Sequence, residues 1–335
     1  MARAWFERRE QVSAGVLRKA RRLALWMGRR RALVFLWLVT LYFYVVSPDA
    51  RQGILGFYKR LSGAKPSSGR VLRHFYVFAQ TILDRAYLLA QHPDAPRCEI
   101  RGFEAVAEYL ARGQGCVLLG AHIGSFEAAR AAALMRPELR MQVIMHTEIS
   151  RKLDEALAPP DRPDVAATLG SALGLLGIKE SLDKGGLVGM MGDRALAGEA
   201  TQGRHFLGAD AEFPVRPLRL AAVLQAPVFF FAALYKTAVD GQRYYEVVFE
   251  KLSLAAPSGH ERSFWVQVLG ERYTAALQKY CRIAPDNWFN FYDFWHTPTG
   301  RPSTLGLYGK PHGVRRRAPL DRAAVATDPP AHSKP

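Results

Sequence analysis

The sequence has few cysteines and lacks the short motifs that mark the commonest hydrolases, metalloproteases and nucleotide-binding enzymes. Its three cysteines, Cys98, Cys116 and Cys281, are an odd number at spacings that fit neither a disulfide framework nor a metal site, which favours a reducing compartment. The sequence contains no GxSxG nucleophile elbow, no HExxH zinc motif and no Walker-type phosphate loop. We therefore expect neither a bound metal nor a cofactor, and other residues must carry any chemistry.

Acidic residues are also scarce, since 30 Asp and Glu stand against 46 Lys and Arg, for a formal net charge of +16. Most of the excess lies at the ends, with +8 in residues 1–31 and +5 in residues 298–335, so that only +3 remains between them. A nucleic-acid enzyme more often carries basic residues on the face that meets its substrate, whereas basic ends beside an apolar segment suit an anionic membrane surface. We predict a membrane partner and no nucleic-acid partner.

No apolar run is long enough to be an ordinary transmembrane helix. The longest, "ALVFLWLVTLYFYVV" at residues 32–46, forms a helix of roughly 22 Å against a hydrocarbon core of about 30 Å. The preceding 31 residues and the Pro48-Asp49-Ala50 sequence argue against a cleaved signal peptide. The positive-inside rule keeps the basic arm cytoplasmic, but the sequence leaves open whether residues 32–46 cross the bilayer or dip and return.

The basic arm itself permits two interpretations. Apolar residues recur in it at helical spacing, with Arg and Lys on the other side, as in a helix that lies on a charged interface; a solvated basic arm is the alternative. We divide the chain into the arm with its hydrophobic anchor (1–56), a catalytic domain (57–297) and a basic, Pro/Ala/Arg-rich tail without fixed structure (298–335).

The pattern of the middle region predicts an α/β fold with a mostly parallel central sheet flanked by helices. Residues 57–91 have a helical pattern whose aromatic side chains could face the core or lipid, and "GFEAVAEYLARGQG" predicts a helix that ends at Gly113 or Gly115. Short apolar runs then alternate with helical patterns near 125–136, 165–183 and 217–225, and "YYEVVFEKL" at 244–252 adds an antiparallel strand. The predicted parallel strands are "CVLLGAH", "MQVIMHT", "GGLVGMMGDR" and "APVFFFAALYK".

Polar residues end each predicted parallel strand, and such strand ends are where ligands bind in open α/β sheets. His122 ends the first strand, His146 the second, Asp193-Arg194 the third and Tyr235-Lys236 the fourth. We expect these residues to share one edge of the sheet.

The stretch "GAHIGSFEAAR" at residues 120–130 is the strongest candidate for chemistry. Ser125 is a good N-cap for a helix that places Glu127 in its first turn, and a bend at Gly124 can fold His122 back onto that carboxylate. A carboxylate that holds one ring nitrogen fixes the tautomer and leaves the other nitrogen free to accept a proton from a hydroxyl. The alternative is a capped helix with an incidental histidine.

This stretch resembles the HxxxxD/E motif of the lysophospholipid acyltransferase superfamily, and the form with Glu is similar to the branch that contains the bacterial late acyltransferases of lipid A biosynthesis. The similarity extends in order over about residues 70–297, through "DKGGLVGMMGDRALAG", "HFLGADAEFPVRPLRLAAVLQAPVFFF" and "APDNWFNFYDFW". The resemblance implies a glycerolipid acyltransferase-like fold and acyl transfer to a hydroxyl of a membrane lipid or glycolipid. The donor would be an acyl thioester, with acyl carrier protein favoured over coenzyme A as the co-substrate.

By the resemblance, His122 is the general base and Glu127 its orienting partner, at the cytoplasmic side of a bacterial inner membrane. Oxyanion or substrate-positioning candidates are Gly124, Ser125, Asp193 and Arg194, with Asp193 expected to pair with Arg194 or to form a purely structural ion pair. His146, Arg216 and Arg219 are candidates for binding the acceptor or a phosphate.

Two departures from the branch leave the acceptor open. Val215-Arg216-Pro217 follows the Phe-Pro where many members have glycine, and Ser125 replaces a familiar asparagine. A different glycolipid, an aminolipid or a lipid-anchored polyene intermediate is compatible with these changes. Two other functions also remain compatible with the sequence: a lipid or thioester hydrolase that uses the same pair, and a non-catalytic membrane binder built on the basic ends.

Overall fold

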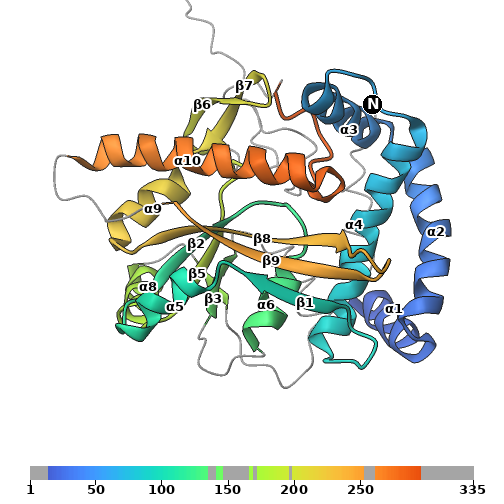
Figure 1. The fold of residues 1–335 in the computed structure, drawn as a ribbon, viewed down its shortest axis with the longest axis horizontal. Coiled ribbons are helices and arrows are strands. Elements are labelled where there is room, and N and C mark those ends of the chain that lie inside the picture. The colour runs from blue at the N-terminus through green and yellow to red at the C-terminus, as the bar shows by residue number, and fades with distance from the viewer. Residues whose placement is uncertain are drawn as a thin grey trace, which may run out of the picture.

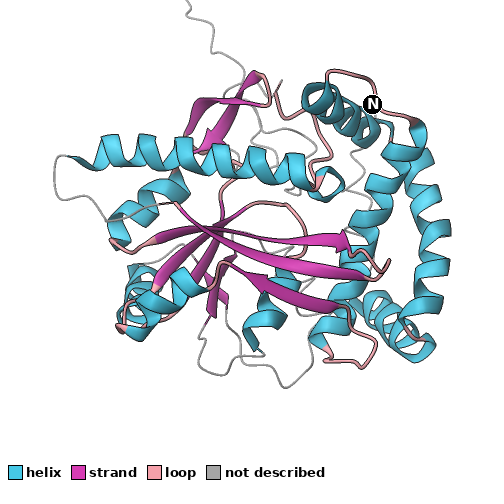
Figure 2. Ribbon diagram, in the orientation of Figure 1, coloured by secondary structure: helices cyan, strands magenta, loops and turns pink. Residues whose placement is uncertain are grey.

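The computed structural model describes residues 14–134, 141–145, 166–168, 172–195, 198–252 and 261–295. Figures 1 and 2 show a sheet with helices on both faces and a helical region beside it that is built from the first described residues. The helices are α1 (Ala14–Met27), α2 (Arg29–Val46), α3 (Pro48–Ser62), α4 (Ser68–Leu89), α5 (Glu104–Ala111), α6 (Phe126–Leu134), α8 (Ala172–Asp183), α9 (Arg216–Leu224), α10 (Arg262–Ile283) and a 3-10 helix, η3 (Pro285–Asn287).

The strands form one large sheet and one hairpin. They are β1 (Arg97–Arg101), β2 (Cys116–Gly120), β3 (Met141–Met145), β4 (Ala166–Thr168), β5 (Leu187–Met191), β6 (Thr201–Phe206), β7 (Ala209–Pro214), β8 (Val228–Thr237) and β9 (Arg243–Lys251). The seven-stranded sheet has the order β1-β9-β8-β2-β5-β3-β4, and β6 pairs with β7 separately. Every pairing from β8 through β4 is parallel and β9 is antiparallel to β8, so the predicted mostly parallel α/β sheet is confirmed.

Side chains of β2 alternate between two hydrophobic clusters, as the period of two in a strand requires. Val117 and Leu119 pack in the cluster that includes α8, α9 and α10, whereas Cys116 and Leu118 pack in the cluster that includes α5 and α6. All five residues of β2 are buried, which explains why the strand reads as a continuous apolar run. Figure 1 shows α10 above the sheet and α6 below it.

Several element predictions needed correction. The helical pattern over 57–91 proves to be the end of α3 and all of α4, separated by a turn with Gly63 in the left-handed region. In the predicted helical segment 165–183, the described residues form the short strand β4 and the helix α8. Strand β1 and the β6–β7 hairpin were not predicted as elements, because β1 is a polar edge strand and the hairpin has an irregular apolar pattern.

Helix α4 connects the helices that precede the sheet to the core of the protein. Val71, Phe75, Val77 and Leu88 of α4 are buried in the two hydrophobic clusters, so this helix belongs to the core. The predicted boundary at residue 56/57 falls inside α3. Among the described residues no single helix is long and apolar enough to cross a bilayer, and α2 with α3 passes that test only as a pair bent by 92°. The predicted tail at 298–335 lies outside the described residues.

Candidate active site

The candidate site lies where two neighbouring parallel strands end. Gly120 of β2 and Met191 of β5 are partners in the sheet register, and His122 and Asp193 each follow two residues later. The same advance along two paired strands brings these side chains together: His122 Nδ1 lies 2.8 Å from Asp193 Oδ1. The backbone N–H of His122 donates to Asp193 Oδ2 at 3.0 Å. The carboxylate therefore fixes both the ring and the backbone of the histidine.

Asp193 is a buried, charged partner for a histidine that reaches the surface. Its side chain is 0% exposed, whereas that of His122 is 29% exposed. Burial by itself raises the pKa of Asp193, but His122, through its charge and two hydrogen bonds, and the charge of Arg194 outweigh this and hold that pKa at about 2. Asp193 is thus an anion at neutral pH and stabilises the tautomer of His122 that carries its proton on Nδ1.

Glu127 has a different partner from the one predicted. Its carboxylate forms an ion pair with Arg85 of α4, with Oε1 at 3.3 Å from Nη2, and both side chains are largely buried. Glu127 Oε2 is buried and has no hydrogen-bond partner among the described residues. The predicted orientation of His122 by Glu127 is therefore corrected: the ring nitrogen contacts Asp193, and Glu127 joins α6 to α4.

Gly124 makes the bend that the sequence predicted. Its φ is +71°, and a Cβ there would lie 1.8 Å from the carbonyl oxygen of Ala233 on β8, so only glycine fits without a shift of the backbone. Its N–H donates to the carbonyl of Asn287 at 2.8 Å. This amide, predicted as an oxyanion donor, is already used within the protein.

Ser125 is the N-terminal cap of α6, as predicted. Its hydroxyl accepts from the N–H of Ala128 at 3.2 Å, and its own N–H donates to the carbonyl of Ala233 at 2.8 Å. Ser125 is therefore a structural residue that fixes the start of the helix behind His122, and its amide is not directed at a substrate.

The segment after α10 supports the loop that carries His122, and sequence reasoning missed this contribution. The N–H of Phe289 donates to the carbonyl of His122 at 2.8 Å. The side chain of Asn287 binds both backbone groups of Tyr235 on β8, at 2.7 Å and 3.2 Å, while its carbonyl accepts from Gly124. The block "APDNWFNFYDFW" was recognised in the sequence as part of the family resemblance. Its contacts with the loop that carries His122 are not visible in the sequence.

Arg194 points toward this same segment. Its Nη2 donates to the carbonyl of Phe289, and its guanidinium carbon lies 5.7 Å from the ring centroid of Tyr292. The Nε atom is buried without a hydrogen-bond partner among the described residues. The predicted pairing of Asp193 with Arg194 is corrected as a hydrogen-bonded contact, since the hydrogen bonds of Asp193 go to His122, although the charge of Arg194 still lowers the pKa of Asp193.

Three further residues, Arg216, Arg219 and His146, were predicted to bind the acceptor or a phosphate. Arg216 and Arg219 are exposed on α9, and His146 lies outside the described residues. Lys236 forms an ion pair with Glu246 across β8 and β9. Within the described ranges, no group of three or more His, Cys, Asp or Glu side chains is placed to hold a metal ion.

Comparison with known proteins identifies the family of this chain. A sequence model described as bacterial lipid A biosynthesis acyltransferase matches residues 70–261, more than half of the chain. The chain belongs to this family. Membership confirms the resemblance noted in the sequence and assigns acyl transfer to a lipid as the general activity. No curated protein matches the chain. The match spans His122, Glu127, Asp193 and Arg194, whereas the supporting residues Asn287 and Phe289 lie beyond its end.

Proposed function

We propose that the protein moves a fatty acyl group from an acyl thioester to a hydroxyl of a membrane lipid or glycolipid, with His122 as the general base. The observation that carries this proposal is the contact between His122 Nδ1 and the buried carboxylate of Asp193, in a loop that leaves the histidine side chain 29% exposed. A histidine held in this way presents Nε2 as a proton acceptor, which is what a substrate hydroxyl needs in order to attack.

The chemical step follows from this arrangement. Nε2 of His122 accepts the proton as the lipid hydroxyl oxygen forms a bond with the thioester carbonyl carbon, and the resulting imidazolium is stabilised by Asp193. The tetrahedral intermediate then loses its carbon–sulfur bond, and the thiol leaves with the proton that His122 had accepted. The products are an ester and a free thiol, and no further reactant is required.

The negative oxygen of the intermediate needs a donor, and removing one such donor typically costs about 3 kcal/mol of transition-state stabilisation. We assign this role to Arg194 because it follows Asp193 directly and its Nε has no hydrogen-bond partner among the described residues. The amides of Gly124 and Ser125 are less suitable, since both donate to backbone carbonyls.

We assign acyl carrier protein as the donor, in preference to coenzyme A, and the cytoplasmic side of a bacterial inner membrane as the location. Both assignments rest on the family resemblance, and on the fact that an acyl thioester is a cytoplasmic substrate. The basic residues of the chain, at a net charge of +16, suit an acidic carrier protein as well as anionic lipid.

Glu127 acts, in this proposal, on the position of His122 through α6. Its ion pair with Arg85 ties the first turn of α6 to α4, and the loop with His122 ends where α6 begins. We therefore describe Glu127 as a positioning residue. Direct contact between Glu127 and His122, expected from the sequence, is not needed for the base to be oriented.

The test separates transfer from hydrolysis, because the same histidine could activate water. Purified protein is incubated with membrane lipid and with acyl carrier protein that carries a radiolabelled acyl chain. The label is then followed into lipid and into free fatty acid. Acylated lipid that requires His122 supports the proposal, whereas free fatty acid without acylated lipid supports a hydrolase and overturns it. Mass spectrometry of the acylated product then identifies the acceptor and the acyl chain.

A further inference from the structure

One face of α2 is an apolar surface that no described part of the protein covers. Its residues recur at helical spacing along the whole helix, and we call them the α2 stripe. The stripe consists of Val34 (69% exposed), Phe35 (57%), Leu38 (68%), Leu41 (50%), Tyr42 (59%) and Val45 (62%). Large side chains that gather in this way on one face mark an interaction site, since scattered exposed apolar residues do not form a continuous strip.

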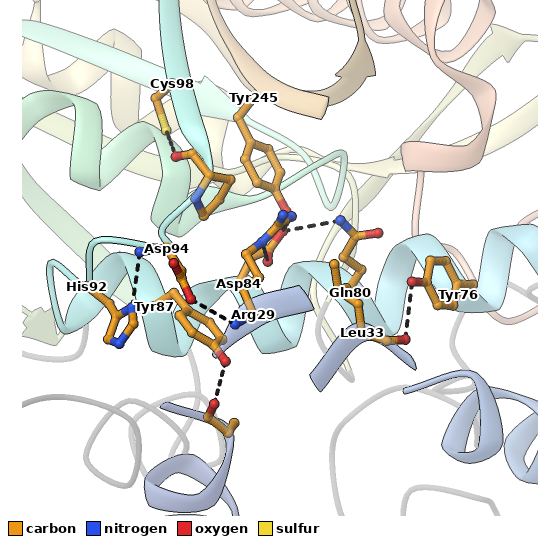
Figure 3. Close-up of polar contacts among 12 residues, drawn as sticks. Arg29, Leu33, Tyr76, Gln80, Asp84, Tyr87, His92, Asp94, Cys98 and Tyr245 are labelled. Carbon is orange, nitrogen blue, oxygen red and sulfur yellow. Dashed lines mark hydrogen bonds and ion pairs between the residues drawn. The ribbon is translucent and has the colours of Figure 1, made fainter. Parts of the chain in front are cut away.

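The opposite face of α2 packs against α4 at both ends of the helix. Near its start the hydroxyl of Tyr76 donates to the carbonyl of Leu33 at 3.4 Å, and the ring of Trp37 stacks on Tyr76 with centroids 4.2 Å apart. Near its end Tyr44 meets Phe75 edge to face. Figure 3 shows Leu33 and Tyr76 at this contact.

A buried ion pair fastens the start of α2 to α4. Arg29 reaches Asp84 with Nε at 2.7 Å and Nη2 at 3.0 Å, and the side chain of Asp84 is 0% exposed. Asp84 also accepts from the hydroxyl of Tyr245 at 3.0 Å, so the pair is connected to the central sheet. In Figure 3 these side chains converge on Asp84 between the two helices. Separation of α2 from α4 would leave a buried charge without its partner, which is strongly unfavourable.

This docking is inconsistent with a helix that crosses the bilayer. A crossing helix is surrounded by lipid or by other apolar segments, whereas α2 keeps one face on a helix that carries Asp84 and Arg85. Its 18 residues end in a bend of 92° into α3. At about 1.5 Å per residue, α2 is also shorter than a hydrocarbon core of about 30 Å.

Basic residues lie beside the stripe and indicate which partner covers it. Arg30 and Arg31 are exposed at the start of α2. On α1, Lys19 and Arg22 are exposed together with Leu23 (53%) and Trp26 (83%). Exposed tryptophan, basic side chains and an apolar strip on adjacent helices are typical of segments that lie at the interface of an anionic membrane.

We propose that α2 lies in the plane of an anionic lipid bilayer, with the α2 stripe at the boundary between headgroups and acyl chains and the basic residues of α1 and α2 at the lipid phosphates. The protein is then attached to one leaflet and does not cross it. This inference gives the proposed acyltransferase its orientation at the membrane, but vesicle binding does not depend on turnover, so the two can fail separately.

The first experiment measures binding of the full chain to sedimenting vesicles. Phosphatidylcholine vesicles with about 30% phosphatidylglycerol should bind the wild type more tightly than phosphatidylcholine alone, because basic residues are attracted to anionic lipid. Val34→Glu with Leu38→Glu should weaken binding at least tenfold on both vesicles. Arg30→Gln with Arg31→Gln should weaken it on the anionic vesicles only.

The matched control is Leu176→Glu with Phe264→Glu, because these side chains are also exposed, at 65% and 71%, but lie on α8 and α10. This control should bind vesicles like the wild type. If this control weakened vesicle binding as much as Val34→Glu with Leu38→Glu does, the proposal would be overturned. A dimer that forms in solution without vesicles, and that Leu38→Glu dissociates, would also overturn it. The stripe would then be covered by a second copy of the chain.

The second experiment distinguishes lying in the plane from crossing. Nitroxide labels are placed at residues 34, 38, 41 and 45, one at a time in a Cys98→Ser background, and their depth in vesicles is measured from collisions with oxygen and a nickel complex. A helix in the plane gives similar depths at all four positions, about 5–10 Å below the headgroups. A crossing helix would give depths that differ by roughly 16 Å between residues 34 and 45, which would overturn the proposal.

Discussion

Asp193 holds His122 at two atoms, with Oδ1 2.8 Å from the ring Nδ1 and Oδ2 accepting from the backbone N–H at 3.0 Å. The two residues are 71 positions apart in the chain and come together because β2 and β5 are neighbours in register. The rotation of the imidazole and the course of the loop are therefore set by one carboxylate. Changes in that loop should affect catalysis even where they do not touch His122.

Gly124→Ala tests this dependence on the loop. The new Cβ would lie 1.8 Å from the carbonyl oxygen of Ala233, in a residue whose φ is +71°, so the loop must move away from β8. We expect a loss of more than about 3 kcal/mol in the free energy of unfolding, or no folded protein, because strain at positive φ and a backbone clash add together. Urea denaturation and the acyl transfer assay measure the two effects.

The matched control for this change is Gly241→Ala. Gly241 has a similar φ of +79°, but nothing lies within 4 Å of a Cβ at that position. The control should therefore lose only about 1–2 kcal/mol, the cost of the left-handed conformation, and keep its activity. If both variants lost the same stability, the close approach of Gly124 to β8 would not matter.

The ion pair between Glu127 and Arg85 gives a second prediction. Because the side chains of Glu127 and Arg85 are 5% and 14% exposed, Glu127→Gln should lower the free energy of unfolding by about 3 kcal/mol, since it removes one charge of a buried ion pair. Glu127→Gln with Arg85→Met should recover part of that loss. Denaturant unfolding of the two single variants and the double variant measures the coupling.

Asp183→Asn serves as the control, since the exposed pair of Asp183 with Lys179 on α8 should contribute little to stability. If Glu127→Gln kept full stability but lost acyl transfer, Glu127 would act on the chemistry directly, as the sequence predicted.

His74 makes stability depend on pH. Burial lowers its pKa from 6.5 to about 4, more than the nearby charge of Asp286 raises it, so the native protein keeps the ring neutral where an unfolded chain protonates it. Unfolding therefore takes up a proton between these pH values, and this group should remove about 3 kcal/mol of stability as the pH falls from 6.5 to 4. Denaturation at a series of pH values measures the slope.

His74→Gln should flatten that slope even though it also changes stability at neutral pH. His205→Gln is the control, because the side chain of His205 is 70% exposed on the β6–β7 hairpin. An unchanged slope in His74→Gln would show that the buried ring does not govern the acid dependence.

The sequence predicted the sheet better than the site. Continuous apolar runs such as Cys116–Gly120 and Leu187–Met191 predict buried parallel strands, because strands covered on both faces have no polar alternation. The sequence also predicted that polar residues follow these strands at one edge. It does not give the spatial order of the strands, and only that order makes Asp193 the neighbour of His122.

The sequence predicted that Glu127 orients His122 because the two residues are only five positions apart. In the structure the carboxylate of Glu127 instead forms an ion pair with Arg85 on α4. Asn287 was missed for a similar reason: its contacts with Tyr235 and Gly124 join segments that are more than fifty residues apart. Contacts of this kind follow from tertiary packing, which no local pattern encodes.

The most direct test of the proposed base is the rate of acyl transfer from a labelled thioester to membrane lipid, measured for His122→Ala and Asp193→Asn with circular dichroism to verify the fold. A matched control exists on the surface, where His205 and Asp210 form an exposed pair with 3.4 Å between Nδ1 and Oδ1. We predict that each change at the site lowers the rate by about 10²- to 10⁴-fold while His205→Ala and Asp210→Asn leave it unchanged. A folded His122→Ala or Asp193→Asn variant that transfers the acyl group at the wild-type rate would contradict the account.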